Sequence, residues 1–126
     1  MHHGGGVSVA TNSIFWGNTA DTSNPEINGT ITATYCDVGG SYSGTGNIDL
    51  EPYFVDPYAA TSGNPTILGD FHLCYASGVP ADCSNKSNAI DVGDDGTNIE
   101  PDPPTDDIDG DSRPQGSGFD MGADEY

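Results

Sequence analysis

Basic side chains are almost absent from this sequence. Lys86 and Arg113 stand against 20 acidic residues, which gives a formal net charge of −18 over 126 residues. Nucleic-acid binding needs lysine and arginine to contact the phosphates, and anionic membrane surfaces repel a strongly acidic protein. We therefore expect no nucleic-acid partner. The surplus of carboxylates favours divalent cations such as calcium, or forms a solvated acidic surface without any specific site.

Long apolar runs and helical patterns are also missing. No stretch reaches the roughly 18 apolar residues that a transmembrane helix requires, so we expect no membrane insertion. Apolar residues make up only 33% of the chain, which contains 18 glycines and 9 prolines. This composition cannot fill a thick helical core, but it suits many short strands joined by tight turns. The sequence predicts an all-β fold in one domain.

The first six residues, Met-His-His-Gly-Gly-Gly, lack the apolar core of a signal peptide. If the protein is extracellular, we expect that its signal has been removed or that the sequence is a piece of a longer chain. A terminal amine with histidine at position 3 can also chelate copper(II), although a terminus without any function explains these residues more simply.

Cysteine is scarce, with three residues in the chain. Cys74 and Cys83 are separated by eight residues that include Gly78 and Pro80, and a disulfide closes such a loop easily. Cys36 is then left over among apolar neighbours, where we expect a buried free thiol. A Cys74–Cys83 disulfide indicates an oxidising compartment.

Short strand-like segments, divided by turn residues, recur at intervals of about twenty residues. The segments expected to form strands are residues 7–10, 13–16, 27–36, 69–73, 88–93 and 119–123. This spacing is typical of a solenoid, in which each turn of the chain buries a few side chains and hydrogen-bonds to the turns above and below it.

Two motifs resemble those of a known family. Residues 12–18 read Asn-Ser-Ile-Phe-Trp-Gly-Asn, and residues 107–126 place alternating acids and a glycine turn before the acidic end Asp-Met-Gly-Ala-Asp-Glu-Tyr. Together they resemble the C-terminal segment of secreted right-handed parallel β-helix proteins, the large pectate-lyase-like bacterial surface proteins of the choice-of-anchor type. The resemblance implies this fold and a location outside the cell or at the cell surface.

The resemblance also implies two parts within one structural domain. Residues 1–46 would form short β-helix rungs, and residues 47–126 a terminal rung followed by an irregular C-terminal cap. The last rung of a β-helix exposes unpaired backbone groups along its edge, which is a template for aggregation. An irregular polar segment would protect that edge.

Acidic residues converge on a glycine turn near the C-terminus. Asp107, Asp109 and Asp111 surround Gly110, and carboxylates two residues apart can point at one hard cation such as calcium. The loop is not an EF-hand, because no bidentate acid follows at the required position and no flanking helix is predicted. The alternative is that Arg113 pairs with one of these acids and only fixes the turn. A second acidic turn contains Asp91, Asp94 and Asp95.

The sequence contains few signals for catalysis. His72 is the only histidine beyond the first three residues, and no nucleophile motif surrounds any serine. Pectate-lyase-like enzymes generally rely on basic side chains to bind an acidic sugar, and only Lys86 and Arg113 are available. Twenty acids make a pair of glycosidase-like carboxylates unavoidable by chance. The sequence therefore favours a non-catalytic role.

Three hypotheses follow for the function. The first is a non-catalytic structural and capping module of an extracellular β-helix surface protein, stabilised by calcium and serving adhesion. The second is a polysaccharide-degrading enzyme, a lyase or glycoside hydrolase, by resemblance to the pectate-lyase-like superfamily. The third is a self-assembling filament subunit. Aromatic side chains that can either stack on a neutral carbohydrate or pack in the core are Trp16, Tyr35, Tyr42, Tyr53 and Tyr58.

The N-terminal segment predicts self-association into a homo-oligomer. A rung that includes Val7, Val9, Ile14 and Phe15 would present an uncovered edge, and pairing with a second chain would satisfy its backbone groups. Two-fold pairing closes a dimer, whereas head-to-tail contact builds a filament. The charge of −18 opposes both, so association should strengthen with salt or calcium.

Overall fold

The computed structural model describes residues 7–19, 26–57, 69–98 and 102–126. Every regular element in these residues is a short strand and none is a helix, which confirms the predicted all-β class for this part of the chain. The strands are β1 (Val9–Thr11), β2 (Ile14–Phe15), β3 (Thr32–Thr34), β4 (Asp37–Val38), β5 (Phe54–Asp56) and β6 (Asp70–Leu73). The same residues contain no helix that is long and apolar enough to cross a membrane.

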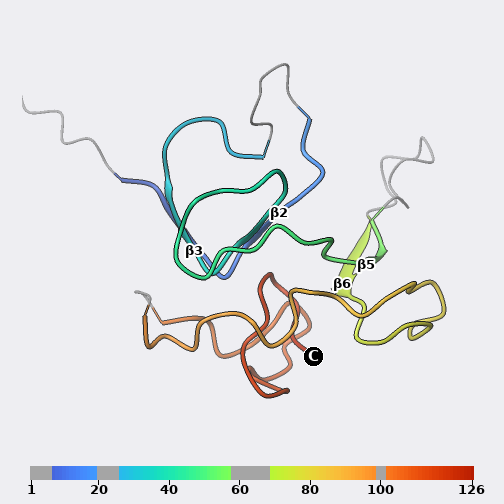
Figure 1. Ribbon diagram of the computed structural model, residues 1–126. Coiled ribbons are helices and arrows are strands. Elements are labelled where there is room, and N and C mark those ends of the chain that lie inside the picture. Colours follow the sequence, from blue (N-terminus) through green and yellow to red (C-terminus); the bar gives the residue numbers. More distant parts are fainter. Residues whose placement is uncertain (1–6, 20–25, 58–68, 99–101) are drawn as a thin grey trace, which may run out of the picture.

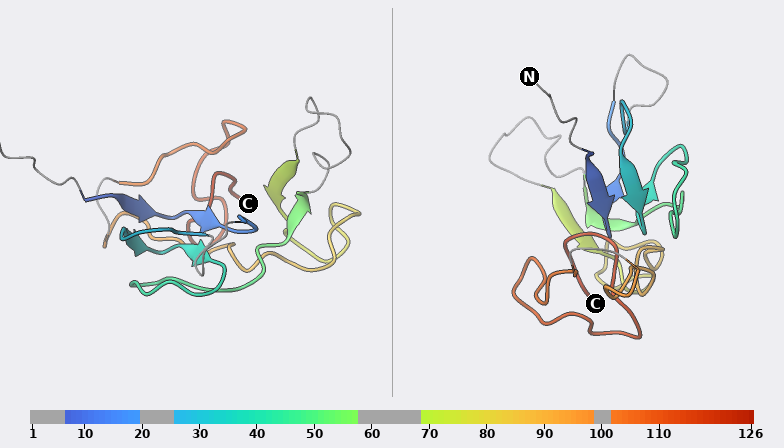
Figure 2. Two further views of the ribbon diagram at one scale, coloured as in Figure 1. Left: turned by 90° about the horizontal axis from the view of Figure 1, so that it is seen from above. Right: turned by 90° about the vertical axis from the view of Figure 1, so that its left-hand side faces the viewer.

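The first four strands form two parallel ladders. β1 pairs with β3, with Ala10 opposite Ala33, and β2 pairs with β4, with Ile14 opposite Asp37. Asp37 also forms a parallel bridge with Ile48, so that three passes of the chain are hydrogen-bonded in succession at this point. Figure 1 shows these passes as stacked coils, and Figure 2 shows the ladders from two further sides.

Equivalent corners separate the strands of successive passes. Asn12, between β1 and β2, has a φ of 43°, and Tyr35, between β3 and β4, has a φ of 51°. Each corner lies two residues before a residue of the Ile14–Asp37 pair. The left-handed conformation, which is uncommon for residues other than glycine, turns the chain sharply from the first ladder into the second.

β5 and β6 form a separate antiparallel pair with one irregularity in its register. Phe54 lies opposite Leu73, and the Cys74 N–H extends the pairing by donating to the carbonyl of Tyr53 at 2.9 Å. The rings of Phe54 and Phe71 meet edge to face, with centroids 5.4 Å apart. This pair lies at one side of the stacked coils (Figure 1).

Two small apolar clusters form the core. The first lies within the coils and contains the buried residues Ile27, Ala33, Cys36 and Val38. The second joins the two parts of the chain, because it packs buried side chains of the later segments against partly buried ones of the coils. Its later members are Leu73, Ala89, Ile90 and Met121, and its members from the coils are Ile14, Tyr35 and Ile48.

The strands predicted at residues 88–93 and 119–123 are wrong. Residues 88–91 form a turn and residues 121–123 a bend, and only Gly93 and Phe119 form an isolated antiparallel bridge. The Asp91 N–H donates to the Asp120 carboxylate at 2.7 Å instead of to a neighbouring strand, and Asp91 has a φ of 62°. The Met121 N–H does donate to the Ala89 carbonyl at 2.9 Å, so isolated backbone bonds and a side-chain acceptor stand where a continuous ladder was predicted.

Cys74 and Cys83 form the predicted disulfide, with their Cα atoms 5.5 Å apart. Cys36 is a fully buried free thiol, also as predicted, and its Sγ lies 3.3 Å from the carbonyl oxygen of Thr34. Burial raises the pKa of Cys36, which makes its reactive thiolate form less available.

Candidate functional site

The acidic loop predicted to bind calcium is a tight turn that begins and ends at an isolated bridge between Asp106 and Ser112. The Asp107 carboxylate accepts the N–H groups of Asp109, at 2.9 Å, and of Asp111, at 2.8 Å. Desolvation opposes ionisation of Asp107, but these backbone hydrogen bonds outweigh it and lower the pKa of the carboxyl. Asp107 therefore holds the turn itself.

The side chain of Asp109 contacts a histidine of the antiparallel β5–β6 pair instead of the other acids of the loop. The two ring nitrogens of His72, in β6, lie 2.6 Å from Asp70 Oδ1 and 3.0 Å from Asp109 Oδ2. An imidazole donates through both nitrogens only when it is protonated, so this arrangement favours the imidazolium. The hydrogen bond to Asp70 is the largest cause that raises the pKa of His72; partial burial opposes it, and Asp124 and Asp109 add to it.

The clamp formed by Asp70, His72 and Asp109 joins segments that are 37 residues apart. The alternation of side chains in a strand places Asp70 and His72 on one face of β6, a signal that the sequence did contain. The contact with Asp109 has no local signal. It depends on how the acidic loop folds back against the β5–β6 pair.

Asp107, Asp109 and Asp111 all line one cavity, but their side chains do not form a metal-binding group. Among the residues that the structure describes, no group of three or more His, Cys, Asp and Glu side chains could hold a metal ion. Calcium binding by Asp107, Asp109 and Asp111 therefore stays a prediction.

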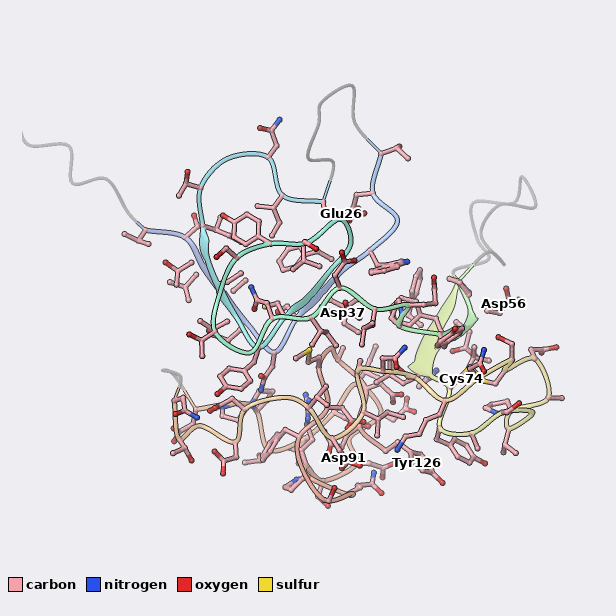
Figure 3. All side chains as sticks on the ribbon, in the orientation of Figure 1. Glu26, Asp37, Asp56, Cys74, Asp91 and Tyr126 are labelled. Carbon is pink, nitrogen blue, oxygen red and sulfur yellow. A yellow bond between two sulfur atoms is a disulfide. The ribbon has the colours of Figure 1, made fainter. Side chains whose placement is uncertain are left out.

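A cavity of about 280 Å³ lies beside the clamp. Asp109, His72 and Asp124 line one part of it, and the stacked rings of Tyr75 and Tyr126, with centroids 4.0 Å apart, belong to the same lining. Burial raises the pKa of Asp124, whose carboxylate accepts the N–H of Leu73 at 2.7 Å. The C-terminal residue, Tyr126, is labelled in Figure 3.

Arg113 does not pair with the acidic loop, so the alternative proposed for this arginine is wrong. Its Nε donates to Glu125 at 2.9 Å, and its guanidinium also donates to the carbonyl oxygens of Asp120, at 2.7 Å, and Gly122, at 3.3 Å. The loop reverses the chain, which brings Arg113 inward against the C-terminal segment rather than outward beside the aspartates. Arg113 and Glu125 are both buried, and the ring of Phe119 lies 5.7 Å from the guanidinium carbon.

The second acidic turn also uses its carboxylates to hold the backbone. Asp91 accepts the N–H groups of Ser117 and Gly118, at 2.6 and 2.9 Å, and so ties the C-terminal segment to the turn. Asp94 accepts the N–H groups of Gly96 and Asn98, both at 3.0 Å. These acids act as structural acceptors in the described residues.

Asp37 and Asp120 are fully buried, and burial is the main cause that raises the pKa of each carboxyl group to about 6. Asp120 accepts the N–H groups of Asp91 and Tyr126, one on each oxygen. Asp37, in β4, accepts only the N–H of Leu50, at 3.2 Å, and its Oδ2 has no hydrogen-bond partner among the described residues.

The aromatic residues that could stack on a carbohydrate divide between core and surface. Tyr35 and Tyr42 pack against the apolar clusters, and the Tyr42 hydroxyl lies 3.1 Å from the carbonyl oxygen of Ile31. Trp16 and Tyr53 line one groove instead. The remaining candidate, Tyr58, and the copper motif at residues 1–3 lie outside the described residues.

Comparisons with protein-family models, with curated proteins and with solved structures found no match for this chain.

Proposed function

We propose that this chain is a non-catalytic structural and capping module of an extracellular right-handed parallel β-helix surface protein. The observation that carries the proposal is the parallel succession of Ile14, Asp37 and Ile48. Val38 N–H donates to Ile48, and Ile48 N–H donates to Cys36, both at 2.9 Å. Pairing of each pass of the chain with the next, in parallel, is the hydrogen-bonding pattern of a β-helix.

The contacts of the later segments with the first corner support a capping role. The Asn12 side chain donates to the carbonyl of Asp94 and accepts the N–H of the same residue, both at 2.8 Å. The Gly122 N–H donates to the Asn12 carbonyl, also at 2.8 Å. Residues 69–98 and 102–126 thus satisfy polar groups that a bare corner would leave to solvent.

The engagement of both basic side chains supports a non-catalytic role. Arg113 is buried against Glu125, and Lys86 Nζ lies 4.0 Å from Asp91. An enzyme that bound and deprotonated an acidic sugar would need such side chains in its groove. The Cys74–Cys83 disulfide supports the extracellular or surface location, because disulfides persist in oxidising compartments.

Self-association through the first strand is a second proposed role. β1 has one neighbouring strand, β3, among the described residues, and its flank carries Val7 and Val9 with exposed fractions of 76% and 58%. An edge with open backbone groups and exposed valines can pair with the same edge of a second copy.

The capping role can be tested with two core truncations. Met121→Ala weakens the cluster that joins the later segments to the coils, whereas Ile27→Ala weakens the cluster within the coils. Each should lower the free energy of unfolding by about 2–5 kcal/mol. Only Met121→Ala should cause aggregation below its melting temperature, measured by light scattering, because only this variant loosens the cap. Equal aggregation of the two variants, or none, would contradict the proposal.

A further inference from the structure

A groove of about 730 Å³ opens between the residues that follow β2 and the β5–β6 pair. Four aromatic residues and three acidic residues line it, and of the aromatic ones Phe54 also packs against the second apolar cluster. The aromatic residues are Trp16, Tyr53, Phe54 and Phe71, and the acids are Glu51, Asp56 and Asp82. One of these acids, Asp56, is labelled in Figure 3.

The aromatic side chains are fixed from different parts of the fold. The Trp16 ring passes over Gly39, where an added Cβ would stand 3.3 Å from the ring, so a residue without a side chain makes room for it. Tyr53 has a φ of 46°, a conformation that is uncommon for a bulky residue. The backbone of Tyr53 is fixed by a hydrogen bond from the N–H of Cys74 to its carbonyl oxygen. Phe71 is 56% exposed even though it packs edge to face against Phe54.

The charged residues that line the groove are all acidic. Glu51 and Asp82 are both exposed, and Asp82 directly precedes the disulfide-bonded Cys83, which fixes its place at the rim. The two basic side chains of the chain are engaged elsewhere, Arg113 with Glu125 and Lys86 beside Asp91. Among the described residues, the groove lining therefore contains acidic and aromatic side chains and no lysine or arginine.

We infer that this groove binds a small organic cation, an ammonium group that carries apolar substituents. The electron-rich faces of aromatic rings attract such cations, and nearby carboxylates add direct charge complementarity. The volume lies in the range of small-molecule sites. A neutral sugar could stack on the same rings, but it would gain nothing from the carboxylates' charge or from the net charge of −18. The inference does not depend on the proposed structural role.

Trp16 is the only tryptophan in the chain, so its fluorescence reports on this groove directly. The test titrates the full chain with choline and, separately, with the neutral carbon isostere in which carbon replaces the quaternary nitrogen. Sodium chloride at matched concentrations controls for ionic strength. We expect a saturable change in Trp16 fluorescence with choline and binding at least about tenfold weaker for the isostere.

Three variants locate the site. Phe71→Leu keeps apolar bulk but removes an exposed ring, and Asp82→Asn removes one exposed carboxylate; each should weaken choline binding by about three- to tenfold. Asp106→Asn removes the same charge from an exposed position outside the groove and should leave binding unchanged. Circular dichroism checks that all three fold.

Four results with the native protein would overturn the inference. They are the absence of a saturable response to choline, an equal response to sodium chloride, equal affinity for the isostere, and tighter binding of a neutral oligosaccharide than of choline. Loss of choline binding in Asp106→Asn as large as in Asp82→Asn would also overturn it, because the attraction would then belong to the whole charged surface rather than to the groove.

Discussion

Replacing Asp37 with asparagine should make the protein more stable at neutral and alkaline pH. Asp37 is fully buried in β4, where Oδ1 accepts the N–H of Leu50 and Oδ2 lacks a partner among the described residues. Desolvation is the main cause that raises its pKa to about 6, and the neighbouring carboxylates of Asp49 and Glu51 raise it further. Asparagine keeps the acceptor for Leu50 and carries no charge.

The sign and size of the effect follow from the pKa. The folded protein holds the Asp37 proton more tightly than the unfolded chain, whose carboxyl has a pKa near 3.8. The stability that this group contributes is therefore fully present below pH 3.8 and is lost as the pH rises through about 6. A pKa difference of about two units corresponds to about 3 kcal/mol in the free energy of unfolding. Asp37→Asn should exceed the native protein by up to about 3 kcal/mol at about pH 8 and should nearly equal it at about pH 4.

Urea denaturation at a series of pH values measures this difference. Asp120→Asn is a matched control, because Asp120 has the same raised pKa but accepts a backbone N–H on each oxygen. An amide nitrogen in place of either oxygen leaves one of these donors unpaired, so this variant should be less stable than the native protein near pH 4. The reasoning is refuted if Asp37→Asn shows the same stability difference at both ends of the pH range, or if it is the less stable protein at about pH 8.

Four further predictions concern the rest of the molecule. The clamp of Asp70, His72 and Asp109 should contribute to the free energy of unfolding below pH 6.5, and this contribution should be lost as the pH rises through the raised pKa of His72. Urea titrations of His72→Gln should not show this pH dependence. Cys74→Ser should cost roughly 2–3 kcal/mol in the free energy of unfolding, and thiol counting on the denatured, unreduced native chain should find Cys36 alone. Millimolar calcium should raise the melting temperature of the native protein but not of Asp111→Asn, a variant that leaves the His72–Asp109 contact in place; equal responses would remove this site. Sedimentation should show association that increases with salt, and a monomer at every salt concentration would contradict self-assembly.

Some local features of the fold were predictable from the sequence, whereas its long-range contacts and the strands β4 and β5 were not. Segments 7–10, 13–16, 27–36 and 69–73 do contain strands, because alternating apolar and small residues bounded by turn residues specify short strands locally. The disulfide was predictable because the loop between Cys74 and Cys83 is short.

The two wrong strand predictions have a physical explanation. Residues 88–93 and 119–123 have the composition of strands, but they share only isolated backbone hydrogen bonds, from Gly93 to Phe119 and from Met121 to Ala89. The N–H groups of Asp91 and Asp120 donate to carboxylates instead, which interrupts a continuous ladder. The partner of Arg113 was missed for a similar reason. Asp107, Asp109 and Asp111 are closer in the sequence than Glu125, yet the reversal of the chain directs the guanidinium toward the C-terminus. Neither outcome has a signal in residue spacing.

These contacts change how the acidic composition is understood. A protein with short ladders leaves many backbone N–H groups without a strand partner, and each buried donor needs an acceptor. Asp91, Asp94, Asp107 and Asp120 accept two or more backbone N–H groups each. A carboxylate does this better than a hydroxyl, because an ionised acceptor forms the stronger hydrogen bond and offers two oxygens. Part of the negative charge therefore has a structural cause that requires no cation. An organic cation is better sought at carboxylates outside this hydrogen-bonding role, and the exposed Glu51 and Asp82 at the rim of the aromatic groove meet that condition.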